Sequence, residues 1–93
     1  MAKASVHAVV TGRVQGVFFR MFVLRESKVA GACGIVRNRL DGAVEILAEG
    51  ERSKLEQFIE RLRQGPPKSA VENVEAEWDE YRHDYDDFTI EYD

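Results

Sequence analysis

The chain has 93 residues and a mass of 10.6 kDa, a size that predicts one compact domain spanning residues 1–93. Its residues are 44% hydrophobic and 32% charged, a composition that is too apolar for a disordered protein. The net charge of -4 argues against a general nucleic-acid-binding protein, because such proteins usually carry a clustered positive field.

Positive charge is concentrated in the first part of the chain. Residues 1–39 hold seven basic residues and one acidic residue, whereas residues 40–93 hold six basic and 16 acidic residues. A small anion site in the N-terminal half would produce this asymmetry, and so would an ordinary solvated division of charge.

Three features of the sequence indicate where in the cell the protein acts. No apolar run approaches the roughly 20 residues that a membrane span needs, and the N-terminus lacks the apolar core of a secretion signal. Cys33 is the only cysteine, which excludes an intrachain disulfide and a cysteine-rich zinc site. We therefore expect a cytoplasmic protein that has no membrane partner.

The first elements read as strand, loop and helix. Residues 5–11 are rich in β-branched side chains and predict a strand. The segment 12–20 has two glycines four positions apart, which is typical of a tight loop. Apolar residues at near-helical spacing then predict a helix over residues 21–30, which Gly31 and Gly34 end.

The next elements read as a hairpin and a second helix. Apolar segments at 35–36 and 43–48 predict two strands, and Asp41 and Gly42 form a hairpin turn signal between them. Ser53 and Glu56 then have the spacing of a capping box and are followed by apolar residues at helical spacing.

Two further strands are predicted at 71–82 and 88–92. The order is βαββαβ with a short extra C-terminal strand. Such an order places both helices on one face of an antiparallel sheet. The sequence therefore predicts an α+β, ferredoxin-like sandwich.

The loop from Gly12 to Arg20 is the strongest candidate for a binding site. It joins the end of a strand to the start of a helix, where backbone N–H groups lack intrahelical partners and attract anions. Gly16 adopts a positive φ at little cost, which allows several N–H groups to turn inward as a nest. The residues of this expected nest are Gln15, Gly16, Val17, Phe18 and Phe19.

Arg20, in the first turn of the helix, is placed to grip two phosphate oxygens with its guanidinium. The alternative interpretation is a solvated helix arginine beside an ordinary turn glycine. Of the two phenylalanines, we expect Phe19 to pack into the core and Phe18 to form a wall of the site.

Asn38 is a second candidate, because it ends a strand whose edge the expected sheet brings close to the first loop. Its amide would orient a water molecule, although an asparagine also commonly opens a hairpin.

Several familiar chemistries are excluded by what the sequence lacks. Neither a nucleotide-binding P-loop motif nor a dinucleotide-binding glycine motif is present, and the loop offers no nucleophilic side chain. His7 lies within a strand, and His83 has no second histidine at ligand spacing. The aspartates at 84, 86 and 87 read as a solvated acidic turn. We expect neither a metal nor another cofactor.

The segments GRVQGVFFR at 12–20 and GIVRNRLDGAVE at 34–45 resemble the two signature segments of the acylphosphatase family in order and spacing. The resemblance continues through residues 65–71 and 88–90. It implies a ferredoxin-like fold and metal-independent hydrolysis of acyl phosphates to a carboxylate and inorganic phosphate. It maps the family's phosphate-binding arginine onto Arg20 and its water-positioning asparagine onto Asn38.

The expected substrate is a small acyl phosphate, with inorganic phosphate as product and competitor, and nothing in the sequence requires more than a monomer. The alternative function is a non-catalytic phosphate- or anion-binding regulatory module, because one fold hosts many functions. The chain departs from the family at Ala30, Ala32 and Ile35, where larger apolar side chains are common. We expect these smaller residues to lower stability, because they bury less apolar area.

Overall fold

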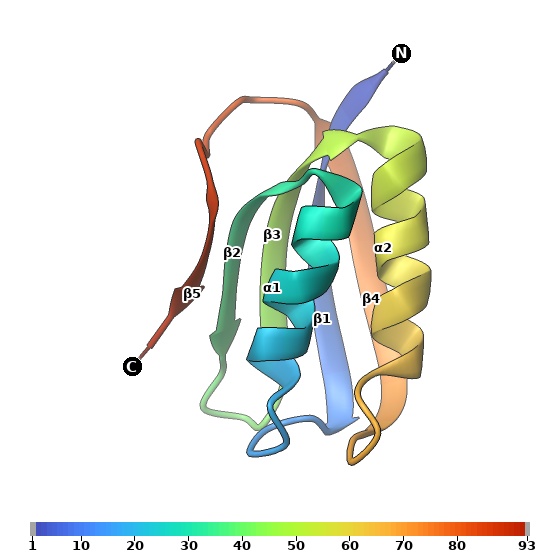
Figure 1. Ribbon diagram of the computed structural model, residues 1–93, viewed down its shortest axis with the longest axis vertical. Helices are drawn as coiled ribbons and strands as arrows, with labels where there is room; N and C mark the ends of the chain where they lie inside the picture. The colour runs from blue at the N-terminus through green and yellow to red at the C-terminus, as the bar shows by residue number, and fades with distance from the viewer. Residues whose placement is uncertain (1, 93) are drawn as a thin grey trace.

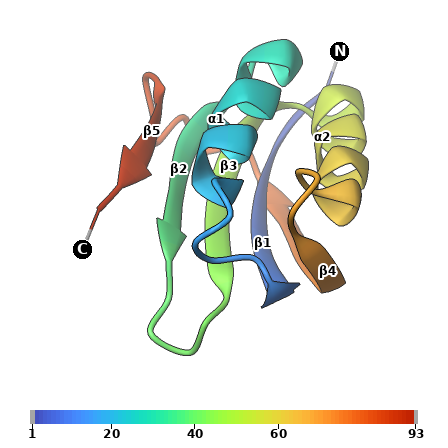
Figure 2. The same ribbon diagram turned by 60° about the horizontal axis from the view of Figure 1, so that its bottom comes forward.

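The computed structural model describes residues 2–92, which form two helices and five strands. In chain order these are β1 (Lys3–Arg13), α1 (Phe19–Ala30), β2 (Cys33–Asn38), β3 (Val44–Glu51), α2 (Arg52–Gln64), β4 (Ala70–Glu80) and β5 (Phe88–Glu91). Both helices lie side by side over the same face of the sheet (Figures 1 and 2). The α+β, ferredoxin-like arrangement with an extra C-terminal strand is therefore confirmed.

The sheet has the order β4-β1-β3-β2-β5. Its first four strands are antiparallel, because β1 pairs with β3 and β4, and β3 pairs with β2. The last strand differs from the expectation, since β5 pairs with β2 in parallel. The sheet is thus mixed. The parallel pairing arises because the chain crosses from β4 at one edge to the opposite edge before β5 begins (Figure 1).

The core lies between the sheet and the two helices. Alternate residues of β1 and β3 face the helices and are buried, namely Val6, Ala8, Val10, Val44, Ile46 and Ala48. The helices contribute Phe19, Phe22, Val23, Leu55, Phe58, Ile59 and Leu62. Burying each large apolar side chain contributes about 1.5–3 kcal/mol, so this layer supplies most of the drive to fold.

The small residues Ala30 and Ala32 are buried within this core. Ile35, which is half-buried, lies on the neighbouring strand β2. Among the described residues, neither helix is long and apolar enough to cross a membrane.

The start of α2 differs from the sequence prediction. The helix begins at Arg52, and the residue before it, Glu51, makes no side-chain capping bond. Ser53 lies inside the first turn and its Oγ donates to Oε1 of Glu51 at 3.3 Å, so the predicted capping box is wrong. Strand β3 pairs with β1 as far as Glu51, and the N–H of Arg52 donates to the carbonyl oxygen of Ala2 at 2.9 Å. This backbone contact starts the helix ahead of Ser53.

A buried carboxylate, Glu49, holds the segment that carries the chain from β4 to β5. Only 4% of Glu49 is exposed. Its Oε1 accepts hydrogen bonds from the backbone N–H groups of Asp84 at 2.9 Å and Tyr85 at 3.1 Å. Its Oε2 accepts from the hydroxyl of Ser5 at 3.3 Å. Because these bonds fix the crossing segment, they also help to place β5 against β2.

We expect Glu49→Ala to lower the free energy of unfolding by about 2 kcal/mol, because hydrogen bonds to a charged group contribute about 1.5–3 kcal/mol. Urea unfolding measures the loss. The control is Glu75→Ala, which removes an exposed glutamate from β4. Equal stability of the two variants would show that Glu49 does not hold the crossing segment.

Candidate active site

The loop between β1 and α1 has an unusual backbone. Gly16 has a φ of 73°, and Phe18, the residue that precedes the helix, has a φ of 61° and a ψ of 27°. The left-handed conformation costs a residue other than glycine roughly 1–2 kcal/mol, so Phe18 is strained. Turns of this kind gather successive N–H groups into a concave surface that binds anions.

The N–H groups of this loop remain available to a ligand. Among the described residues, no backbone N–H from 15 to 21 donates a hydrogen bond to a protein atom, and the first such bond runs from the N–H of Phe22 to the carbonyl oxygen of Phe18 at 3.1 Å. The first turn of any helix leaves such donors unpaired, and together with the helix dipole they favour negative charge. The loop can therefore supply several donors to an anion.

Gln15 ties this loop to the hairpin between β2 and β3. Its side-chain amide donates to the carbonyl oxygens of Arg39 at 2.8 Å and Ala43 at 2.9 Å. The side chain therefore faces the hairpin, and only the backbone N–H of Gln15 is left for the expected nest. Figure 2 shows the two loops at the same end of the molecule.

Arg20 lies in the first turn of α1 beside the last strand. One guanidinium nitrogen donates to the carbonyl oxygen of Glu91 at 3.4 Å, and the guanidinium carbon lies 4.9 Å from the ring centre of Tyr92. No carboxylate of residues 2–92 forms an ion pair with Arg20. Since a guanidinium has five N–H donors, most of them remain available to an anion.

Asn38 ends β2, and its side chain holds an unpartnered acceptor. The Oδ1 atom is buried and has no hydrogen-bond partner among the described residues. A buried acceptor without a partner costs about 1–3 kcal/mol, which makes such atoms rare in proteins. This oxygen therefore has unused capacity to accept a hydrogen bond.

These residues surround one pocket of about 350 Å³. Its walls are Val14, Gly16, Phe18, Phe19, Arg20, Met21, Asn38, Ile90 and Tyr92. Five of the seven predicted site residues therefore line one cavity, while Gln15 and Val17 do not. Phe19 is 1% exposed and packs into the core, whereas Phe18 is 82% exposed and forms part of the rim, as the sequence predicts.

Met21, Ile90 and Tyr92 are pocket residues that sequence reasoning missed. Met21 follows the loop by one residue, so its place in the first helical turn was the available signal. Ile90 lies on β5, and Tyr92 follows the last residue of that strand, Glu91. No local pattern reveals that β5 lies against β2, and thus that these two residues border the pocket.

The charge of the pocket suits an anion, because among residues 2–92 the only charged residue that lines it is Arg20. A second hollow of about 390 Å³ lies elsewhere and is lined by one arginine, Arg82, and by four carboxylates, those of Glu49, Glu77, Asp79 and Asp84, so negative charge predominates there. These negative charges repel a phosphate. The pocket beside Arg20 is therefore the better candidate.

The other candidate residues of the sequence do not form a site. His7 shares a hydrogen bond of 2.6 Å with Glu45, which also accepts from Arg37 at 2.7 Å. Burial raises the pKa of Glu45, but these two bonds outweigh it and hold the pKa below its usual value. Cys33 is half-buried and does not line the pocket. Within residues 2–92, no group of histidine, cysteine or carboxylate side chains is arranged to hold a metal.

Comparison with known proteins confirms the resemblance found in the sequence. The model of the acylphosphatase family matches residues 6–90. An acylphosphatase of Pelotomaculum thermopropionicum is 41% identical over 90 residues, which cover 97% of this chain and 98% of that protein. An acylphosphatase of Pyrobaculum arsenaticum is 44% identical over 91 residues, which cover 97% of this chain and 96% of that protein.

The fold of this chain also matches that of a relative whose structure has been solved. The crystal structure of acylphosphatase from Bacillus subtilis matches with a TM-score of 0.92 at 39% identity, and the match covers 96% of this chain and 99% of that one. Sequence and structure thus agree over almost the full length. The chain belongs to the acylphosphatase family and hydrolyses acyl phosphates.

Proposed function

We propose that the pocket beside Arg20 is the place where the acyl phosphate is bound and hydrolysed. One observation carries this proposal. A guanidinium with unused donors and a buried acceptor without a partner, Oδ1 of Asn38, line the same cavity. The first group suits a phosphoryl group and the second suits a water molecule.

In this proposal the phosphoryl oxygens lie against the start of α1. They accept hydrogen bonds from the backbone N–H groups of Gln15, Gly16, Val17, Phe18 and Phe19. Arg20 binds the same oxygens from the side, and charge-assisted bonds of this kind contribute about 1.5–3 kcal/mol each. The donors are fixed by the fold before the substrate arrives, so little reorganisation opposes binding.

Asn38 then holds the attacking water, which donates a hydrogen bond to Oδ1. The water oxygen forms a new bond to phosphorus while the bond between phosphorus and the acyl oxygen breaks. The electron pair of that bond leaves with the carboxylate, and the proton of the water passes to the phosphate or to solvent. Because a carboxylate is already a good leaving group, positioning and charge stabilisation suffice without a protein base.

The donors that line the pocket are of the wrong kind for a metal ion. Magnesium prefers oxygen ligands and is usually held by carboxylates, and none of the described residues that line the pocket carries one. We propose that the reaction needs no metal, and we expect an excess of EDTA to leave kcat/KM for benzoyl phosphate unchanged. A loss of activity that added magnesium restores would contradict this.

The proposal also includes the domain organisation, the oligomeric state and the location of the protein. Residues 1–93 constitute one acylphosphatase domain, supported by the family match and by the one core that both helices cover. We propose a monomer, because residues of one chain complete the pocket. A cytoplasmic location and the lack of a nucleic-acid partner rest on the single cysteine and the net negative charge. Sedimentation equilibrium at assay concentration tests the monomer.

We expect Arg20→Gln to lower kcat/KM for benzoyl phosphate by at least 100- to 1000-fold, about 2.7–4 kcal/mol, the usual cost of losing a donor to a developing anion. Competitive inhibition by inorganic phosphate is expected to weaken as well. The control is Arg25→Gln, which removes a cation from the same helix but not from the pocket. Equal effects of the two substitutions would refute a specific role for Arg20.

We expect Asn38→Ala to lower kcat about 100-fold, because the water loses its acceptor, and to leave the inhibition constant of phosphate unchanged. The free energy of unfolding is expected to stay the same or to rise, because a buried unpaired acceptor is removed. Asn73→Ala, on the exposed part of β4, is the control. Full kcat in Asn38→Ala would mean that another group positions the water.

A further inference from the structure

Exposed apolar side chains gather around the pocket. Phe18 is 82% exposed, Tyr92 70% and Met21 49%, and all three line the same cavity. Only two other large apolar residues are comparably exposed among the described residues, Val29 and Leu40, and neither lines it. Apolar groups that cluster on a surface mark a binding site more often than single ones do.

These side chains lie beside the phosphate-binding elements and come from two parts of the chain. Phe18 and Met21 flank the start of α1, while Ile90 and Tyr92 come from the end of the chain, which β5 holds against β2. We name these four residues the acyl wall. With Arg20 and the loop N–H groups assigned to the phosphoryl group, the acyl wall is the surface left for the other half of the substrate.

The charge of the pocket limits the charge that the acyl group of the substrate can carry. Of the residues that the structure describes, Arg20 is the only charged one that lines the pocket, and in the proposed function the phosphoryl group occupies it. Residues 2–92 thus leave no further cation in the pocket for a second negative group. The volume of about 350 Å³ is near the lower end of small-molecule sites, which span roughly 300–1,000 Å³, and it is large enough for one ring beside the phosphoryl group.

We propose that the acyl wall makes this enzyme selective for acyl phosphates whose acyl group is uncharged, apolar and about the size of one aromatic ring. The inference rests on the proposed function and adds to it the class of substrate. Apolar contact with Phe18, Met21, Ile90 and Tyr92 provides the selectivity, because it removes apolar surface of the acyl group from water.

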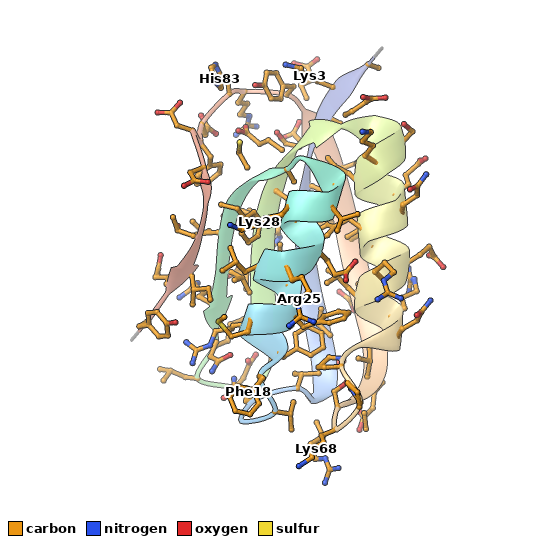
Figure 3. The ribbon with its side chains drawn as sticks, viewed as in Figure 1. Lys3, Phe18, Arg25, Lys28, Lys68 and His83 are labelled. Carbon is orange, nitrogen blue, oxygen red and sulfur yellow. The ribbon has the colours of Figure 1, made fainter. Side chains whose placement is uncertain are left out.

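A groove next to the pocket carries basic side chains, in contrast to the apolar acyl wall. Its charged lining consists of Arg25, Lys68 and the ion pair of Arg61 with Glu26. It shares with the pocket only Phe18 and Met21, which therefore lie between the two. Figure 3 shows Phe18 and Lys68 near the same end of the molecule. An acyl group with a second anionic substituent would have to pass this apolar rim to reach Arg25 and Lys68. The rim therefore separates the ring-sized space from the positive groove.

The test compares three substrates, namely benzoyl phosphate, acetyl phosphate and 4-carboxybenzoyl phosphate. We expect the wild type to have a higher kcat/KM for benzoyl phosphate than for either of the others. Met21→Ala is expected to lower the benzoyl-to-acetyl ratio at least about tenfold, because losing even one methylene contact in an apolar pocket has an effect of that size and this change removes three heavy atoms. Val29→Ala, an equally apolar change on the exposed surface of α1, is expected to leave the ratio unchanged.

The ratio does not depend on the concentration of folded enzyme, so a loss of stability in a variant does not affect it. A ratio that Met21→Ala leaves unchanged would overturn the inference while leaving the proposed function intact. Faster hydrolysis of the carboxylated ring than of the plain ring would also overturn it, in favour of Arg25 and Lys68. A wild type that hydrolyses none of the three substrates would contradict the proposed function itself and the inference with it.

Discussion

The start of helix α1 leaves backbone N–H groups without protein acceptors, and the proposed chemistry depends on these donors. A helix cannot pair its first N–H groups internally, so each must find a side chain, water or ligand. Here the residue before the helix, Phe18, supplies no capping side chain. Its left-handed backbone and the positive φ of Gly16 instead form the loop that offers these donors to an anion.

Two loops at this end of the molecule are tied together beside the pocket. The bonds from Gln15 to the carbonyl oxygens of Arg39 and Ala43 hold the anion-binding loop against the hairpin that follows Asn38. A donor-rich loop and a buried acceptor, which lie about twenty positions apart in the chain, thereby face one cavity. Strain at Phe18 and the unpaired oxygen of Asn38 both lower stability, and such costs are typical of functional sites.

The sequence predicts those parts of the site whose signals are local. Two glycines and an arginine between a strand and a helix indicate an anion site, and Asn38 is found because it ends a strand beside a turn signal. The contribution of β5 is not predictable in this way. Its parallel pairing with β2 and the anchoring of the crossing segment by Glu49 join residues more than thirty positions apart. The capping box at Ser53 fails for a related reason, because contact with the N-terminal segment starts α2 earlier.

In the proposed mechanism the backbone donors of residues 15–19 and the guanidinium of Arg20 bind a tetrahedral anion. The most direct measurement is a titration of the isotopically labelled protein with inorganic phosphate, followed by the amide resonances in NMR spectra. Binding at this loop predicts saturable shifts concentrated at the amides of 15–20, together with a shift of the guanidinium Nε of Arg20. Saturable shifts centred on another surface, or none at phosphate concentrations that inhibit hydrolysis, would contradict it.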